Sequence, residues 1–206
     1  DRIAHDPKSR VNTFLHVNHA EGKPRYGTLM CVNGTGICYS WLKHNLEGNT
    51  DYTDMDARAA KIPPGAERLF LLPYGNGAER TLDNAYPGAA VWNLNFNIHG
   101  RDHLLRAAQE GIIFALRYGF DIIGKMGISV GTIKAGKANM FQSELFCTIF
   151  ANTCGREVQL YDTDGSQGAA RGAGIGAGIY KNAKEAFIGL EKKGHFHHLF
   201  LRNEDM

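Results

Sequence analysis

A long amphipathic segment is the clearest hydrophobic pattern in the chain. Between Arg101 and Lys125, apolar residues recur at intervals of three and four positions, which predicts a helix with one buried face. The residues that make this pattern are Leu104, Leu105, Ala108, Ile112, Ile113 and Leu116. Gly111 lies inside it, and a glycine in a helix interior costs about 1 kcal/mol relative to alanine. We therefore expect another element to approach this helix closely at Gly111.

A strict alternation of apolar and polar residues predicts a strand at Ala90–Ile98. Three asparagines alternate there with the apolar residues Trp92, Leu94, Phe96 and Ile98. Because successive side chains of a strand point to opposite faces, this period predicts one buried face and one exposed face.

Shorter runs complete an alternation of strands and helices. Strands are predicted at Val11–Val17, Arg25–Val32, Arg68–Leu72, Ser129–Ile133 and Glu157–Tyr161. Helices are predicted at Ile37–Asn45, Tyr52–Ile62, Phe141–Cys154, Ser166–Lys181 and Ala183–Glu191. Gly155 is expected to end the Phe141–Cys154 helix, and the tail His195–Met206 has no readable period. The succession predicts an α/β fold in which helices flank a mixed sheet.

Composition is typical of a single globular domain. The 206 residues are 43% hydrophobic and carry a formal charge of +2, without a basic run that would follow a nucleic acid. No apolar stretch approaches the roughly 20 residues that cross a bilayer. Cys31, Cys38, Cys147 and Cys154 form no CxxC pair, so we expect reduced core thiols in a cytoplasmic protein.

Five segments, in order along the chain, resemble the C-terminal domain of the FGGY family of carbohydrate kinases, and within it the xylulokinases. They are Asn12–His19 (NTFLHVNH), Asn33–Leu42 (NGTGICYSWL), Leu72–Thr81 (LPYGNGAERT), His103–Gly111 (HLLRAAQEG) and Ser166–Gly178. The resemblance extends from about Asp6 to Phe187. It implies the ribonuclease-H-like, actin-like ATPase fold, of which this chain would hold an incomplete part.

The resemblance also implies an activity. Members of the family transfer the terminal phosphate of ATP, with Mg²⁺, to a sugar hydroxyl, here D-xylulose to give D-xylulose 5-phosphate. Other sugar kinases of the family, for ribulose, fuculose, rhamnulose or gluconate, stay open. Residues 1–206 would be a C-terminal nucleotide-binding domain fragment without the N-terminal sugar-binding domain. The family's catalytic carboxylate and GTSG loop would precede Asp1, so we expect no catalytic residue here and no activity of the isolated fragment.

Two segments are candidates for contact with ATP. Gly36 lies at the start of a predicted helix, where the family places a nucleotide-contacting glycine, although a tight strand-to-helix turn explains it equally well. Ser40 matches a polar contact of a relative. The counterpart of the family's adenine loop contains Ala138, Asn139, Met140 and Ser143. The loop lacks its usual glycines, which leaves its adenine geometry open; Asn139 either binds adenine or, as we favour, caps the next helix.

Other motifs favour structural interpretations. Gly168, Gly172 and Gly176 line one helical face, which predicts close packing, and Gly165 is the better candidate for a ligand. The Gly-x-Gly spacings only weakly suggest a dinucleotide-binding domain, because the glycines continue into the helix. Glu79 and Arg80 are expected to form a salt bridge.

No metal site is predicted from the histidines. His99 and His103 lack further ligands, so a structural hydrogen bond is expected for His103. The cluster His195–His198 could take up a metal adventitiously but is interpreted as a polar tail. Asp162–Gly165 is read as a turn after a strand. The alternative to a kinase is a non-catalytic actin-like module that binds a nucleotide or a partner; a homodimer is also open, since a truncated domain exposes apolar surface.

Overall fold

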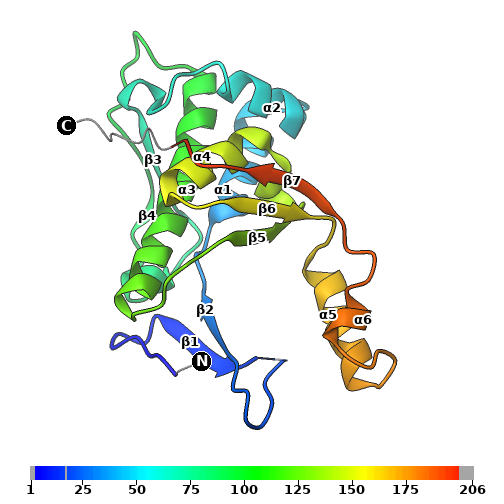
Figure 1. The fold of residues 1–206 in the computed structure, drawn as a ribbon. Helices are drawn as coiled ribbons and strands as arrows, with labels where there is room; N and C mark the ends of the chain where they lie inside the picture. Colours follow the sequence, from blue (N-terminus) through cyan, green and yellow to red (C-terminus); the bar gives the residue numbers. More distant parts are fainter. Residues whose placement is uncertain (1–2, 17, 200–206) are drawn as a thin grey trace, which may run out of the picture.

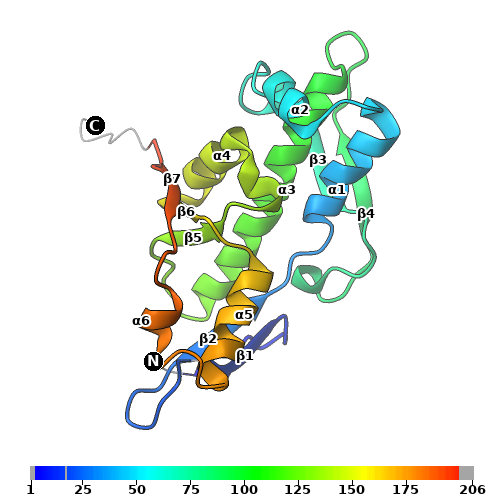
Figure 2. The same cartoon turned by 90° about the vertical axis from the view of Figure 1, so that its right-hand side faces the viewer.

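The long helix α3 (Arg101–Lys125) stands at the centre of the molecule, with the bounds predicted from its periodicity. The computed structural model describes residues 3–16 and 18–199. Figure 1 shows α3 between a two-stranded sheet, β3 (Phe70–Tyr74) and β4 (Gly88–Trp92), and a three-stranded sheet, and Figure 2 shows the same order from the side. The buried residues of α3 include Leu105, Ile112 and Ile113. The helix packs directly against β3 on one side and against α4 on the other, and α4 in turn contacts β7 of the three-stranded sheet.

Strand β3 lies directly on α3 at Gly111. A β-carbon at position 111 would come within 1.9 Å of the carbonyl oxygen of Leu71, a backbone atom. The close approach expected at this glycine is confirmed, and it places β3 and β4, which pair antiparallel with Leu71 opposite Val91, on one side of α3.

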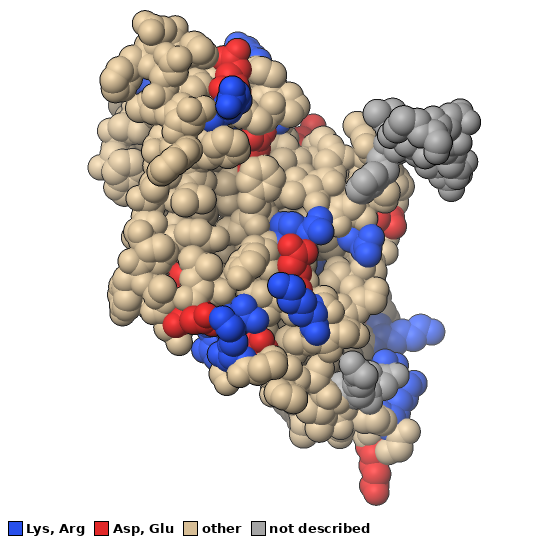
Figure 3. Space-filling model, turned by 90° about the vertical axis from the view of Figure 1, so that its left-hand side faces the viewer, with Lys and Arg blue, Asp and Glu red and all other residues tan. Residues whose placement is uncertain are grey.

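The strand predicted at Ala90–Ile98 is wrong beyond Trp92. Asn93 adopts φ 64°, a left-handed conformation that ends the strand, and its side-chain amide donates to the carbonyl of Arg68. The face expected to be buried is exposed, with Trp92 at 71% and Phe96 at 91% of full exposure. Asparagine is suited to both an alternating strand and a left-handed turn, and here the turn prevails. Figure 3 shows few charged side chains on the face that carries β3 and β4.

The three-stranded sheet is mixed and joins distant segments. Its strands are β5 (Ile133–Gly136), β6 (Val158–Tyr161) and β7 (Lys192–Phe196). β5 and β6 are parallel, and β7 runs antiparallel to β6. The strand predicted at Ser129–Ile133 instead begins at Ile133, and the tail predicted to be irregular supplies β7 up to Phe196. Residues 200–206 of that tail lie outside the described residues. The mixed α/β fold class is confirmed.

Helix α4 (Glu144–Cys154) packs against α3, after a short 3₁₀ turn, η4 (Asn139–Gln142). The predicted helix at Phe141–Cys154 therefore starts three residues later than expected. Phe141, Phe146 and Phe150 form an aromatic cluster with ring centroids 5.3–6.0 Å apart. Gly155 ends the helix at φ 59°, as predicted.

Two further helices pack against α3, and the second of them lies at the upper end of Figure 1. They are α1 (Thr35–Leu42), continued by one π-helical turn, η1 (Lys43–Glu47), and α2 (Tyr52–Ala59), and 3₁₀ turns follow at η2 (Ala66–Arg68) and η3 (Arg80–Leu82). Asp51 caps α2 by accepting from the backbone of Asp54. Arg58 forms ion pairs with Glu47 and Asp102, which ties the upper helices to α3.

The lower end of the molecule carries the N-terminal hairpin and two helices. The first two predicted strands form an antiparallel hairpin of β1 (Val11–Leu15) and β2 (Tyr26–Met30). Val17, the predicted end of the first strand, lies outside the described residues. The helices are α5 (Gly165–Gly176) and α6 (Ala183–Ala186). No described atom lies within 4 Å of a β-carbon built on Gly168, Gly172 or Gly176. The close packing predicted for that face is therefore wrong for the described residues.

The four cysteines are free thiols, although only some belong to the core. Burial raises the pKa of Cys38 and of Cys154 to about 11, and burial of Cys147 raises its pKa to about 12. These three thiols stay protonated at neutral pH. Cys31 is exposed, which corrects the expectation of a core position. Among the described residues, none of the helices is long and apolar enough to cross a bilayer.

Candidate functional site

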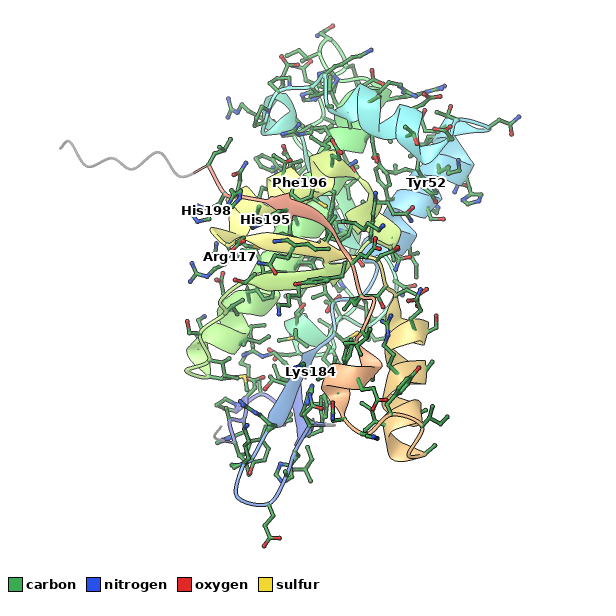
Figure 4. The ribbon with its side chains drawn as sticks, turned by 45° about the vertical axis from the view of Figure 1, so that its right-hand side comes forward. Tyr52, Arg117, Lys184, His195, Phe196 and His198 are labelled. Atoms are coloured by element: carbon green, nitrogen blue, oxygen red, sulfur yellow. The ribbon has the colours of Figure 1, made fainter. Side chains whose placement is uncertain are left out.

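A hollow of about 450 Å³, here called the upper hollow, opens between three segments. Helix α1 contributes Gly36, Tyr39 and Ser40, helix α2 contributes Tyr52, Thr53 and Asp56, and the turn before α4 contributes Asn139, Met140, Gln142 and Ser143. Most of these side chains carry a hydroxyl, amide or carboxyl group, while Met140 and the two tyrosines add apolar surface. Figure 4 shows Tyr52 at the outer edge of α2.

A second hollow of about 670 Å³, the lower hollow, adjoins the first. The two share Gly36, Asn139 and Met140. The lower hollow continues toward the carboxyl ends of β5 and β6, where it is lined by Thr35, Lys134, Gly136, Ala138, Thr163, Asp164 and Gly165. An elongated ligand could therefore occupy both hollows across the shared residues.

The structure brings the six predicted nucleotide-contacting residues together, although they come from segments far apart in the chain. Gly36, Ser40, Asn139, Met140 and Ser143 line the upper hollow, and Ala138 lines the lower one. The contribution of α2 was not predicted from the sequence. Its polar residues carried no motif, and only the packing of α2 against α3 turns Thr53 and Asp56 toward this space.

Asn139 keeps a backbone conformation that glycine usually provides. Its φ is 51°, in the left-handed region, which asparagine tolerates better than most residues. Its side chain makes no hydrogen bond to any described residue and lines both hollows. The helix-capping role favoured for Asn139 is wrong, because Ser143 caps α4: its hydroxyl accepts from the backbone N–H of Phe146 at 3.2 Å.

The N-terminus of α1 faces this space with unoccupied room around Gly36. A β-carbon there would meet no described atom within 4 Å. Gly34, by contrast, adopts φ 77°, and a β-carbon on it would lie 2.4 Å from the carbonyl oxygen of Pro73. The tight strand-to-helix turn thus depends on Gly34. No described side chain caps the first turn of α1, whose backbone N–H groups give this end of the helix a partial positive charge.

The second helix N-terminus at the lower hollow is that of α5. Gly165 begins it with open space around its α-carbon, while Asp164 caps it by accepting from Gln167 N at 2.8 Å. Residues 162–164 connect β6 to α5, as predicted for a segment after a strand, while Gly165 already belongs to the helix. Gly136 has a packing role, because a β-carbon there would lie 2.2 Å from the carbonyl oxygen of Thr163. Lys134 brings a positive charge to the lower hollow.

A buried polar network fixes the floor of the upper hollow. The Tyr39 hydroxyl donates to Asp56 Oδ1 at 2.9 Å, and Gln109 Nε2 from α3 donates to the same carboxylate at 2.6 Å and to the Tyr39 oxygen at 2.9 Å. Burial, reinforced by the neighbouring Asp56 charge, raises the pKa of Tyr39 far above its usual range. The hydroxyl is therefore a permanent donor that orients Asp56.

Glu79 and Arg80 do not form the predicted salt bridge. Glu79 is buried and accepts from the backbone N–H of Asn33 at 2.9 Å and from Thr81, whereas Arg80 points away and donates to the carbonyls of Ser9 and Arg10. The buried carboxylate is satisfied by neutral donors, so the two residues stabilise different loops.

His103 has the structural role expected for it. Its Nδ1 accepts from the backbone of Gly100 at 3.1 Å, and its Nε2 lies 2.8 Å from Glu67 Oε2. His99, just before α3, places its Nε2 3.1 Å from the backbone carbonyl oxygen of Glu67. Both histidines therefore fasten the start of α3 to η2.

Comparisons with known proteins agree on one family. The C-terminal domain of the FGGY family of carbohydrate kinases matches residues 3–179. Xylulose kinase of Escherichia coli (strain K12) is 31% identical over 188 residues, which cover 89% of this chain and 36% of that protein. The chain thus spans about a third of the length of that relative.

Solved structures show the same fold. Xylulose kinase from Rhodospirillum rubrum superposes with a TM-score of 0.74 at 24% identity, over 94% of this chain and 38% of that one. Plasmodium falciparum glycerol kinase, solved with ADP, superposes with a TM-score of 0.78 at 20% identity, over 96% of this chain and 39% of that one.

Proposed function

Because the chain belongs to the FGGY family of carbohydrate kinases, we propose that the full-length protein phosphorylates a ketose with ATP and that residues 1–206 form its C-terminal nucleotide-binding domain. D-xylulose is the proposed substrate, since the 31% identical relative is a xylulose kinase. The observation that carries the proposal is the meeting of Gly36 and Ser40 with Asn139, Met140 and Ser143 around one hollow.

The chemistry of the two hollows suits the two ends of a nucleotide. The upper hollow offers hydroxyl and amide groups of Ser40, Thr53 and Gln142 beside the apolar surface of Met140, which suits a base with a flat face and polar edges. The lower hollow offers the N-termini of α1 and α5 and the charge of Lys134, which favour phosphate groups. We place the adenosine in the upper hollow and the phosphates toward the lower one.

Magnesium is proposed for the whole enzyme, bound with the phosphates. ATP sites usually hold Mg²⁺ through the phosphates and one or two carboxylates. Asp56 and Asp164 are the carboxylates that line the hollows, and both already accept hydrogen bonds from this chain. Because accepted hydrogen bonds do not prevent a carboxylate from binding a cation, these contacts assign the magnesium to neither residue, and we name no magnesium ligand among the described residues.

Catalysis is proposed to need residues beyond those of this chain. Phosphoryl transfer depends on positioning and on stabilisation of charge, with a group to orient the attacking hydroxyl. We assign no catalytic residue here, and we expect the isolated chain to release no ADP with D-xylulose. Turnover of D-xylulose by this chain alone would overturn that assignment.

Binding of nucleotide to the isolated chain tests the proposed site. Gly36→Leu fills the space that both hollows share, and we expect it to weaken the binding of ATP in a calorimetric titration by on the order of tenfold or more. Gly124→Leu is the matched control, because Gly124 also lies in a helix with open space around it but lines neither hollow. Equal ATP affinity of both variants would contradict the site.

A coupled assay of ADP release by the full-length protein tests the reaction. A panel of ketoses and sugar acids is supplied with Mg²⁺ and ATP, and D-xylulose is expected to give the highest kcat/KM. ATP binding without release of ADP on any sugar would instead identify a non-catalytic nucleotide-binding module. Preference for another sugar would retain the kinase and change only its substrate.

A further inference from the structure

A cluster of two histidines and a glutamate lies on the outer face of the three-stranded sheet. Gln159 of β6 pairs with His195 of β7, and Val158 pairs with Phe196, so the same register brings Glu157 opposite His197. Because side chains alternate along a strand, Glu157, His195 and His197 share one face. Figure 4 shows His195 on β7 and away from Tyr52, which borders the upper hollow.

The opposite face of the same strands holds the core. Val158 and Leu160 are buried, and Phe196 packs against the same hydrophobic cluster. The histidines therefore cannot turn inward without withdrawing Phe196 from the core. Their side chains are held at the surface by packing on the other side of the strand, and the position of the cluster is set by the fold.

The donor atoms of the three residues are close enough to share one ion. They all lie within 4.8 Å of one another. The His195 Nε2 contacts Glu157 Oε1, and the rings of His195 and His197 have centroids 4.0 Å apart. Ligand atoms around a tetrahedral zinc ion are about 3.4 Å apart, given bonds of about 2.0–2.2 Å. Small side-chain rotations would therefore bring all three donors to one cation.

Neighbouring side chains orient the glutamate for this role. Gln159 Nε2 donates to Glu157 Oε1 at 3.2 Å, and Tyr161 in turn donates to Gln159 Oε1 at 2.9 Å. Such outer contacts position metal ligands in known sites. Arg156, the adjacent cation, directs its guanidinium to the carbonyls of Val130 and Gly155. Its hydrogen bonds thus lie with backbone carbonyls, not with the Glu157 carboxylate.

We propose that Glu157, His195 and His197 form a zinc-binding site that fastens β7 to β6. Two imidazoles and a carboxylate are a donor set that Zn²⁺ takes, with water completing the tetrahedron. The site is separate from the proposed ATP site, because Glu157 precedes β6 whereas the lower hollow is lined by Thr163–Gly165 after β6. Mg²⁺ prefers oxygen ligands, so the histidines favour zinc over the ion that accompanies ATP.

A zinc titration of the 206-residue chain, prepared without a polyhistidine tag, tests the site. We expect one zinc ion per chain, a dissociation constant on the order of micromolar, and a rise in Tm with added zinc but not with added Mg²⁺. Co²⁺ in place of zinc should give the visible absorption of a tetrahedral complex. Failure to bind zinc in this range would overturn the proposal.

Three variants identify the ligands, and a fourth is their control. His195→Ala, His197→Ala and the conservative Glu157→Gln should each weaken zinc binding, by about tenfold or more for the histidines. His198→Ala is the matched control, since it removes a neighbouring imidazole from the next position of the alternation. Unchanged affinity in both ligand-histidine variants would show adventitious binding only and overturn the site. Glu157→Gln keeps the test decisive if a histidine variant folds poorly, because it preserves size and shape.

Discussion

The backbone carbonyl oxygen of Leu71 lies so close to Gly111 that a β-carbon on residue 111 would be only 1.9 Å from it. Only glycine lets β3 lie so close to the middle of α3. The neighbouring Gln109 of α3 also holds Tyr39 and Asp56 at the floor of the upper hollow. A single turn of α3 thus sets the distance of the β3–β4 sheet and the position of the candidate site.

Replacing Gly111 should destabilise the protein despite a gain in helix propensity. We expect Gly111→Ala to lower the free energy of unfolding by about 1–3 kcal/mol, because a backbone atom cannot move aside as a flexible side chain can. Denaturant unfolding followed by circular dichroism measures this. Gly124→Ala in the same helix meets no described atom and should be neutral or stabilising by up to about 1 kcal/mol. A loss of stability in both variants would mean that the contact with Leu71 is not the cause.

Removing the Tyr39 hydroxyl should weaken the floor of the upper hollow. Tyr39→Phe leaves Asp56 with one donor fewer in a buried site, and we expect a loss of about 1–2 kcal/mol in unfolding free energy. Tyr52→Phe, whose ring stacks on Tyr39 at 6.0 Å but is 44% exposed, should change stability by less than about 0.5 kcal/mol. Equal effects of the two substitutions would argue against the buried hydrogen bond.

The free energy of unfolding should decrease in acid because Asp6 becomes protonated and loses its ion pair with Arg10. Arg10 donates two side-chain hydrogen bonds and one backbone hydrogen bond to this carboxylate, each 2.8 Å long, and the hydrogen bonds from its side chain hold the pKa of Asp6 well below its usual range. A lowered folded-state pKa gives stability that is present above the unfolded value of about 3.9 and is lost as pH falls toward the folded value. We expect Asp6→Asn to cost about 1–3 kcal/mol at pH 7 and to lose part of the decline below about pH 5.

The exposed pair of Arg117 and Asp121 is the control for that pH dependence. Both side chains are nearly half exposed, and such pairs contribute about 0–1 kcal/mol. Asp121→Asn should therefore leave the Tm at pH 7 nearly unchanged and keep the acid profile of the native chain. Parallel profiles for Asp6→Asn and the native chain, measured by thermal unfolding from pH 7 to 3, would refute the role of Asp6.

Variants of Asn139 should distinguish the contribution of its backbone conformation from that of its side-chain amide at the proposed nucleotide site. Asn139→Gly keeps the left-handed conformation and removes the amide, so we expect an unchanged Tm and weaker ATP binding. Asn139→Ala should also lower stability, by about 1 kcal/mol, because a β-carbon is strained at that φ. Asn84→Gly, at φ 61° and away from both hollows, is the matched control and should bind ATP as the native chain does. Native affinity in Asn139→Gly would remove the amide from the site.

Prediction from the sequence succeeded where the residue pattern of a segment depends only on the secondary structure of that segment. The period of Arg101–Lys125 gave α3 with its bounds, since burying one helical face imposes a spacing of three and four on that segment alone. Gly111 predicted a close contact, because the lower helix propensity of glycine is compensated when another element packs against the helix at that position. Gly155 likewise ended α4. The resemblance of five ordered segments to one kinase family was confirmed by a match over residues 3–179.

Tertiary structure decided the features that depend on distant partners. Asn93 could continue a strand or turn left-handed, and its hydrogen bond to the carbonyl of Arg68 accompanies the turn. Phe196 belongs to a strand because it pairs with Val158 of β6 and its ring packs against the hydrophobic core. Neither contact can be inferred from the residues of the C-terminal tail alone. The salt bridge predicted between Glu79 and Arg80 does not form, because these neighbours in the chain contact different segments. Glu79 accepts from the backbone of Asn33, and Arg80 donates to the carbonyl of Arg10.

The sequence by itself determined the central helix, the α/β class and the family, because these follow from periodicity and from ordered motifs within short segments. The family resemblance also named six residues of the candidate nucleotide site, in two segments far apart in the chain. Only the tertiary structure joined Gly36 to Asn139 across one hollow, added α2 to its wall and brought Glu157 close to His195 and His197. The physical reason is that a pattern reports the environment of its own element, whereas a site depends on the packing of several elements against one another.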